Sequence, residues 1–295
     1  MTQSSRPSIP EAGSNFLSVG AEGNVLQTSL PTMYDLPSEF PEEPGLPDEY
    51  HDLQPQLLSR TLRLKDFGPK ERFAASDLNV YYDVKHPLWH KRPDWFLVVG
   101  VPRLYEGKDL RQSYVVWQER KSPSIVIEFL SPSTEQEDLG RFYQPQDQLT
   151  ESRAIETLPP ADAPPDKVTV YERYLGVAYY LVYNRYAQKL RYFKLHQDQF
   201  EEQPLRSSNP LVWFDDLEIG LGIWQGEFEG VEGAWLRWCD AVGQWLLTDT
   251  EQERQAKEQE RQAKEQERQA KEAAQQRAAR LEQRLRELGI NPEEV

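Results

Sequence analysis

Apolar residues gather in short runs in the middle of the chain, and the two ends lack such runs. The run at 124–130 (S-I-V-I-E-F-L) is rich in β-branched residues and is followed at once by Ser-Pro, a pattern that predicts a buried strand. The run at 94–99 (D-W-F-L-V-V) predicts a second buried strand. Shorter runs predict a first strand at 76–82, a short element at 113–117, and two further strands at 178–183 and 190–193 that form a hairpin.

A helix is predicted at 167–175, because Asp166 suits an N-cap and Gly176 suits the position just after a helix. The polar, proline-rich stretch 140–165 before it predicts a loop or an insertion. The tryptophan-rich stretch 211–247 predicts strands or a short helix that cover the sheet. Packing is the favoured role for its tryptophans over base stacking; they are Trp213, Trp224, Trp235, Trp238 and Trp245.

The chain therefore divides into three parts. Residues 1–55 are rich in Pro, Ser, Gly and acids and predict a poorly ordered or extended acidic leader. Residues 56–247 form the predicted α/β domain. Residues 248–295 form a charged helical tail, in which the heptad E-Q-E-R-Q-A-K repeats three times between 251 and 271 with one apolar residue in each copy. That spacing of charges favours a solvated single helix.

A heptad seam appears only at 274–288, where Ala and Leu recur in alternating steps of four and three. This stretch predicts a weak coiled coil, so a homo-oligomer formed through the C-terminal helix is left open.

The net charge of -15 argues against non-specific binding of nucleic acid driven by counterion release, although it leaves room for a nuclease with local basic groups. The one cysteine, Cys239, excludes an internal disulfide and suits a reducing cytoplasm, where we expect the protein. No apolar stretch is long enough to span a bilayer, so no membrane partner is expected.

Two acids stand in the predicted buried strands. Glu128 lies inside one run and Asp94 opens the other. A buried carboxylate costs several kcal/mol unless it is protonated, paired or bound to a metal, so two of them on adjacent strands favour a divalent-metal site. The alternative is that both are structural acids paired with arginine. Asp77 is interpreted as a turn residue, and Glu137 and Asp138 as helix-start acids that favour the helix dipole.

Other kinds of site find no support in the sequence. Glycine loops of the Walker or dinucleotide type are absent, and the four histidines lack zinc-ligand spacing. Ser131 and Ser133 lie near Glu128 but outside any nucleophile elbow.

Three elements occur in order: Pro93-Asp94 at a strand start, Glu128-Phe129-Leu130-Ser131-Pro132 at a strand end, and Lys167 four residues before Tyr171. Over about 76–193 this order resembles the Uma-type putative restriction endonuclease family, within the PD-(D/E)XK nuclease superfamily. The resemblance implies a restriction-endonuclease-like α/β fold with a mixed sheet flanked by helices. It also implies phosphodiester cleavage with Mg²⁺ or Mn²⁺.

Carried over by residue, the resemblance makes Asp94 and Glu128 the metal ligands, joined by the backbone carbonyl of Phe129. Hard oxygen ligands suit such an ion. Leu130 stands where the superfamily's simplest pattern has lysine, so the catalytic lysine implied is Lys167 on the following helix. Its alternative is a solvated lysine in a first helical turn.

The prediction is a metal-dependent endonuclease that hydrolyses nucleic acid, with DNA the favoured substrate. The alternative is a catalytically silent, nuclease-derived binding or scaffold protein whose tail mediates association.

Overall fold

The computed structural model describes residues 48–131, 133–144 and 163–289, and its centre is a six-stranded mixed sheet. The strand order is β1-β4-β6-β7-β8-β9. Only β6 and β7 run parallel, and the other neighbours are antiparallel. The bounds are β1 (Arg72–Ala75), β4 (Trp95–Val99), β6 (Ile125–Phe129), β7 (Tyr179–Asn184), β8 (Lys189–His196) and β9 (Gln199–Gln203).

β4, which begins just after Asp94, and β6, which carries Glu128, are neighbouring inner strands of this sheet. Every residue of β4 and of β6 is buried, as expected for continuous apolar runs covered on both faces. The strands pair antiparallel, with Trp95 opposite Ile127. The start of β4 therefore lies beside the end of β6, which brings Asp94 next to Glu128.

Two smaller sheets complete the β structure. An antiparallel sheet is formed by β10 (Leu211–Phe214), β11 (Ile219–Phe228) and β12 (Val231–Cys239). A small sheet joins β3 (His90–Lys91), β2 (Val80–Tyr81) and β5 (Tyr114–Val115), and β5 leads into the short helix α2 (Val116–Glu119).

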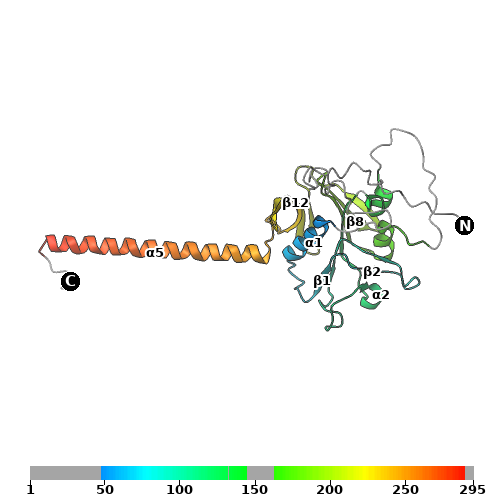
Figure 1. Ribbon diagram of the computed structural model, residues 1–295, viewed down its shortest axis with the longest axis horizontal. Helices are drawn as coiled ribbons and strands as arrows, with labels where there is room; N and C mark the ends of the chain where they lie inside the picture. The colour runs from blue at the N-terminus through cyan, green and yellow to red at the C-terminus, as the bar shows by residue number, and fades with distance from the viewer. Residues whose placement is uncertain (1–47, 132, 145–162, 290–295) are drawn as a thin grey trace, which may run out of the picture.

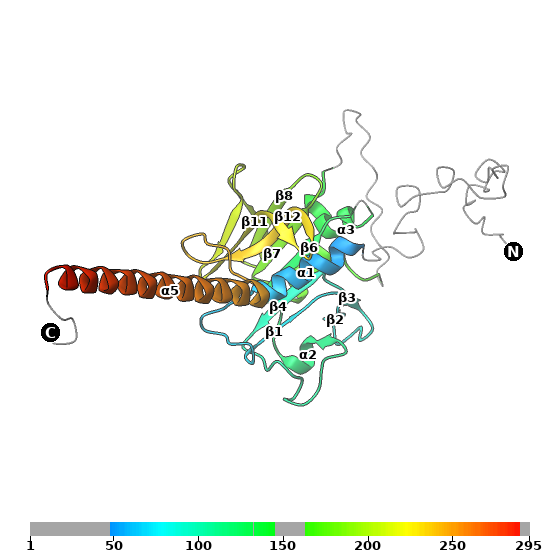
Figure 2. The ribbon, with the colours of Figure 1, turned by 60° about the vertical axis from the view of Figure 1, so that its left-hand side comes forward.

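The central sheet is covered on both faces. Helix α1 (Glu49–Thr61) and the β10–β12 sheet pack on one face, where Leu57, Ile127 and Trp238 share a core. Figure 2 shows α1 beside β6 and β12. The other face packs against α3 (Glu135–Leu139), α4 (Lys167–Thr169) and the π-helical turn η3 (Val170–Tyr174), around a core that includes Val126 and Tyr171.

The helix predicted at 167–175 forms with the expected ends. The Asp166 side chain accepts a hydrogen bond from the Thr169 amide, and Gly176 has φ of +59°, the left-handed conformation that favours glycine after a helix. Its second half is π-helical, since the Leu175 amide donates to the carbonyl of Val170. The short 3₁₀ helix η2 (Gly140–Phe142) follows α3.

The tail begins with the 39-residue helix α5 (Asp249–Glu287), none of whose residues is buried. Thr248 and Glu251 cap its start reciprocally, and Glu251 also pairs with the buried Arg237 at 2.5 Å. Figure 1 shows α5 leaving the body as one straight helix. No helix in the described part of the chain is long and apolar enough to cross a membrane.

The α/β class, the mixed sheet and the long C-terminal helix are thus confirmed. Two boundaries differ from expectation. Of the strand predicted at 76–82, only Val80–Tyr81 forms a strand, β2, because the chain leaves β1 and turns at Asp77, whose φ is +51°. The expected end of the leader at residue 55 falls inside α1, whose buried Leu57 and Leu58 belong to the core. Residues 1–47 and most of the predicted insertion, 145–162, lie outside the described residues.

Candidate active site

Two hydrogen bonds connect Asp94, just before β4, to Glu128 and Phe129 at the end of β6. The Asp94 amide donates to Glu128 Oε2 at 3.1 Å, and the Phe129 amide donates to Asp94 Oδ2 at 2.6 Å. Each carboxylate therefore binds the backbone of the other strand. The two acids that the sequence singles out lie together, as the shared metal site requires.

Glu128 is fully buried and its carboxylate is held on several sides. Tyr171 donates its hydroxyl to Oε1 at 2.6 Å, and Lys167 Nζ lies 3.1 Å from Oε2. Burial raises the pKa of Glu128 well above its usual range; the Lys167 ammonium opposes this rise, and the charges of Asp94 and Asp138 add to it. The spacing of four residues between Lys167 and Tyr171 places both side chains on this one carboxylate.

Lys167 bridges Glu128 to a third acid, Asp138 of α3. Its Nζ lies 2.7 Å from Asp138 Oδ1, and Thr134 donates its hydroxyl to Oδ2 at 2.7 Å. Burial alone would lower the pKa of Lys167, but the charges of Asp138, Glu128 and Asp94 outweigh it, so the pKa lies well above its usual range. The alternative of a solvated first-turn lysine is wrong, because only 12 % of this side chain is exposed.

Asp138 is the residue that the sequence interpretation misplaces. The pattern predicts a helix-start acid with no part in the chemistry, yet the side chain is 1 % exposed and faces Lys167. Its neighbour Glu137 behaves closer to expectation and pairs with Lys91 at 2.7 Å. One feature of the sequence could have predicted that Asp138 is buried. It is the apolar Leu139 directly after Asp138, which is buried and anchors α3 to the sheet. Asp77 keeps its turn role and pairs with Arg92.

The carbonyl of Phe129, the third expected ligand atom, lies beside a residue of α1. His51 Nε2 is 3.1 Å from this oxygen, and His51 Nδ1 is 2.8 Å from Asp48 Oδ1. Asp48 is the N-cap of α1 and also binds Arg185 at 2.7 Å. Zinc-ligand spacing is missing among the four histidines, so sequence reasoning does not predict this contact. The sequence feature that could have predicted the position of the His51 ring is the N-cap acid Asp48, three residues before it.

The donor set fits a small divalent ion of the Mg²⁺ type. No group of three or more His, Cys, Asp and Glu side chains placed to hold a metal ion occurs in ranges 48–131, 133–144 and 163–289. Two carboxylates with one backbone carbonyl are nevertheless what Mg²⁺ takes from a protein, because it keeps several waters and draws further ligands from substrate phosphates. Asp94, Glu128 and the Phe129 carbonyl would be the residues that hold it.

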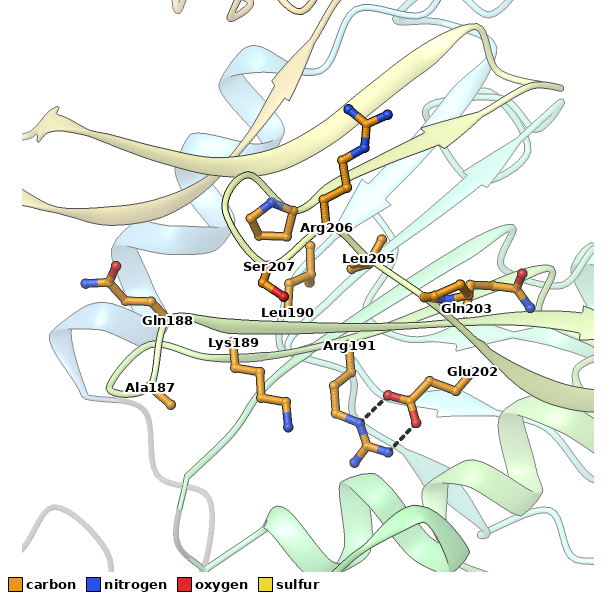
Figure 3. Close-up of a pocket in the computed structure, with 12 residues that line it drawn as sticks. Ala187, Gln188, Lys189, Leu190, Arg191, Glu202, Gln203, Leu205, Arg206 and Ser207 are labelled. Carbon is orange, nitrogen blue, oxygen red and sulfur yellow. Dashed lines mark hydrogen bonds and ion pairs between the residues drawn. The ribbon is translucent and has the colours of Figure 1, made fainter.

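A groove with a volume of about 640 Å³ opens at the same end of the sheet, beside β8 and the segment after β9. Figure 3 shows Lys189 and Arg191 on one side of β8, and Arg206 on the other. The groove is lined by three cations, Lys189, Arg191 and Arg206, and by one acid, Glu202, which pairs with Arg191 at 2.7 Å. Lys189 and Arg206 are exposed and form no ion pair with any described residue.

The strand register places this groove close to the acids. Glu128 lies opposite Val182, and Val182 lies opposite Arg191. Neighbouring strands are about 4.8 Å apart, so the backbone of Arg191 is roughly 10 Å from that of Glu128. Phe193 lies in the same core as Val126, which puts Arg191 and Lys189 on the face of the sheet that Glu128 also occupies.

The tryptophan-rich segment does not contribute to this centre. Trp235 and Trp238 are buried in the core between the central sheet and the β10–β12 sheet, as the packing interpretation predicts. Trp224 lies under the Arg237 guanidinium, 4.2 Å from it.

A comparison with protein families identifies the family of the chain. The model of the Uma2 family, described as "Putative restriction endonuclease", matches residues 30–223. The match is wider than the resemblance over 76–193, and it takes in α1 with His51 and the first strand of the β10–β12 sheet. No curated protein matches the chain. The family model covers more than half of the chain, and the protein belongs to the Uma2 family of putative restriction endonucleases.

Proposed function

We propose that the protein is a metal-dependent endonuclease that hydrolyses phosphodiester bonds in nucleic acid, with DNA as its substrate. The observation that carries the proposal is the convergence of Asp94, Glu128 and Lys167. The Lys167 ammonium lies 3.1 Å from Glu128. The Asp94 amide donates to the Glu128 carboxylate, and the Asp94 carboxylate accepts from the Phe129 amide. Membership of a family described as "Putative restriction endonuclease" supports the reaction class.

Each residue has a role in the proposed reaction. Asp94, Glu128 and the Phe129 carbonyl would hold Mg²⁺ or Mn²⁺, which when bound supplies Lewis-acid activation of water and neutralises phosphate charge. Lys167 would steady the charge that develops on the phosphate. Asp138 positions Lys167, since its carboxylate fixes the ammonium at 2.7 Å beside Glu128.

The groove beside β8 supports nucleic acid as the substrate. Lys189 and Arg206 offer two exposed cations to phosphate, and Arg191 neutralises the one acid of the groove, Glu202. None of the residues that line the groove is aromatic. Contacts there would therefore be made to the phosphate backbone and not to unstacked bases, which is the mode of duplex binding.

A second candidate is a catalytically silent scaffold of nuclease descent. The exposed helix α5 favours it, because none of the 39 residues of this helix is buried and a long charged helix suits association with a partner. The acidic net charge of -15 also favours it. The two candidates differ in whether the centre turns over substrate.

Plasmid nicking tests the proposal. The full chain is incubated with supercoiled plasmid in Mg²⁺, in Mn²⁺ and in EDTA. We expect nicking that needs the ion, and a loss of about 10²-fold or more in Asp94→Asn and in Glu128→Gln. Asp198→Asn is the matched control, since Asp198 is exposed in a turn at φ of +65° that Asn tolerates. If duplex DNA, single-stranded DNA and RNA all stay intact with either ion, the scaffold candidate replaces the nuclease.

A further inference from the structure

The imidazole of His51 is fixed between a carboxylate and the Phe129 carbonyl. Its Nδ1 lies 2.8 Å from Asp48 Oδ1, and its Nε2 lies 3.1 Å from the Phe129 oxygen. Neither acceptor carries a proton to donate, so both ring nitrogens are protonated in this arrangement. Asp48 is itself held, by the amide of His51 at 3.0 Å and by Arg185 at 2.7 Å. The ring therefore has one orientation, with Nε2 directed at a candidate ligand atom.

This arrangement has the features of a metal-binding histidine. Such a histidine almost always donates its second ring nitrogen to a carboxylate, a backbone carbonyl or water, which fixes the ring and its tautomer. Asp48 supplies the carboxylate here. His51 Nε2 and the Phe129 oxygen are 3.1 Å apart, so both could contact one bound ion.

Asp94 lies beside the backbone amide of the same residue, Phe129. Asp94 Oδ2 accepts a hydrogen bond from the Phe129 amide at 2.6 Å. An imidazole nitrogen, a carboxylate and a carbonyl oxygen thus lie around the end of β6. Imidazole is a ligand of transition ions and is seldom taken by Mg²⁺, whose ligands are oxygen atoms.

We propose that His51 is a further ligand of the metal centre, and that the centre consequently binds a divalent transition ion such as Mn²⁺ in preference to Mg²⁺. This inference rests on the proposed function, which places a metal ion at Asp94 and the Phe129 carbonyl. In the metal-free protein a proton on Nε2 joins His51 to the carbonyl. With an ion bound, Nε2 would hold the ion in place of that proton, and the proton would pass to solvent.

A second histidine provides the matched control. His86 Nδ1 lies 2.7 Å from Asp83 Oδ2, with the same spacing of three residues as His51 and Asp48. Its ring stacks on Trp89 and is 43 % exposed, outside the acid cluster. A histidine that only tied a carboxylate in place would behave like His86. His51 differs in the backbone carbonyl that its second nitrogen faces.

Pulsed electron paramagnetic resonance of the untagged, Mn²⁺-loaded full chain tests the ligand directly. We expect echo modulation from a directly bound ¹⁴N nucleus, which changes to the ¹⁵N pattern when the protein carries [¹⁵N]histidine. The modulation should disappear in His51→Gln and persist in His86→Gln. The isotope experiment needs no variant, so it stands even if His51→Gln does not fold. Calorimetry should show the ratio of Mn²⁺ to Mg²⁺ affinity falling about tenfold or more in His51→Gln.

The outcomes distinguish a failure of the His51 inference from a failure of the proposed metal-dependent endonuclease function. If Mn²⁺ binds in a manner that needs Asp94 but shows no histidine nitrogen coupling, the inference is overturned and the nuclease proposal stands. The inference fails equally if His51→Gln keeps the coupling and the affinity ratio. If the wild-type chain binds no Mn²⁺, the inference and the metal-dependent function fall together.

Discussion

Lys167 Nζ lies closer to Asp138, at 2.7 Å, than to Glu128, at 3.1 Å. One buried ammonium therefore serves two buried carboxylates from different elements, β6 and α3. The two ion pairs hold Lys167, which comes from a later helix, in the candidate active site. Leu130, at the position of the superfamily's usual lysine, is buried in the core instead. Because Lys167 pairs with both Glu128 and Asp138, it is a structural residue as well as a candidate catalytic one.

Removing that ammonium should destabilise the fold. In Lys167→Met two buried carboxylates lose their common cation, and we expect the free energy of unfolding to fall by about 3–5 kcal/mol in a urea titration. Lys65→Met is the control, because the Lys65–Glu218 pair is 69 % and 50 % exposed and should contribute under about 1 kcal/mol. A decrease smaller than about 1 kcal/mol in Lys167→Met would mean that the two acids are protonated in the folded protein.

Glu128→Gln should abolish metal binding and cleavage while leaving the metal-free fold as stable or slightly more stable. The raised pKa means that the folded protein binds the Glu128 proton more tightly than the unfolded chain does, so the stability gained from this proton is present at low pH and is lost as the pH rises. The neutral amide of the variant avoids the cost of the buried charge. The check is urea unfolding in EDTA at neutral pH. A decrease above roughly 3 kcal/mol would instead identify Glu128 as one half of a structural ion pair.

His51 should make stability depend on pH. Burial works to lower its pKa, but the hydrogen bond to Asp48, the charge of Asp94 and the Phe129 carbonyl together raise it from 6.5 to about 9. A raised pKa in a base means that its stabilising contribution is complete below pH 6.5 and is lost as the pH rises through about 9.

The measurement is the difference in unfolding free energy between the wild type and His51→Gln, in EDTA, from about pH 6 to about pH 10. Taking the difference removes the contribution of tyrosines and lysines that titrate in the same range. We expect it to shrink toward high pH. A difference that stays constant would show that His51 is neutral in the folded protein.

The groove beside β8 should contribute to the salt dependence of DNA binding. In an inactive Glu128→Gln background, we expect Lys189→Ala with Arg206→Ala to reduce the slope of log affinity against log salt by about 0.9 for each phosphate that the protein no longer neutralises. The assay is fluorescence anisotropy with a labelled duplex. Lys108→Ala with Lys121→Ala, two exposed lysines outside the groove, should leave the slope unchanged. Equal slopes in all three proteins would remove the groove from the binding surface.

The tail should be dispensable beyond its first turns. A chain that stops after Lys257 keeps the cap at Thr248 and the Arg237–Glu251 pair, and should retain core stability and cleavage at equal concentration. A chain that stops before Glu251 leaves Arg237, with 2 % of its side chain exposed, without its partner and should be less stable. Differential scanning calorimetry checks both. Loss of cleavage in the longer truncation would make α5 part of the working unit.

The local patterns of the sequence determined much of this protein. Continuous apolar runs predict β4 and β6 because strands covered on both faces need apolar residues at every position. Asp166 and Gly176 mark the ends of a helix because capping depends on neighbouring residues alone. The charge-balanced heptads predict α5 for the same reason. The acids Asp94 and Glu128 could be singled out because a carboxylate in an apolar run needs a partner.

Tertiary structure alone decided which partners those acids have. Asp138 follows three acidic or amide residues at a helix start, where the dipole by itself accounts for a carboxylate; only the packing of α3 against the sheet buries it beside Lys167. His51 lies 78 residues before Phe129, and α1 reaches the end of β6 only because its apolar face packs on the sheet. Such contacts depend on which surfaces meet across the core. The periodicity of a single segment specifies that a face is buried, and the rest of the fold specifies what that face lies against.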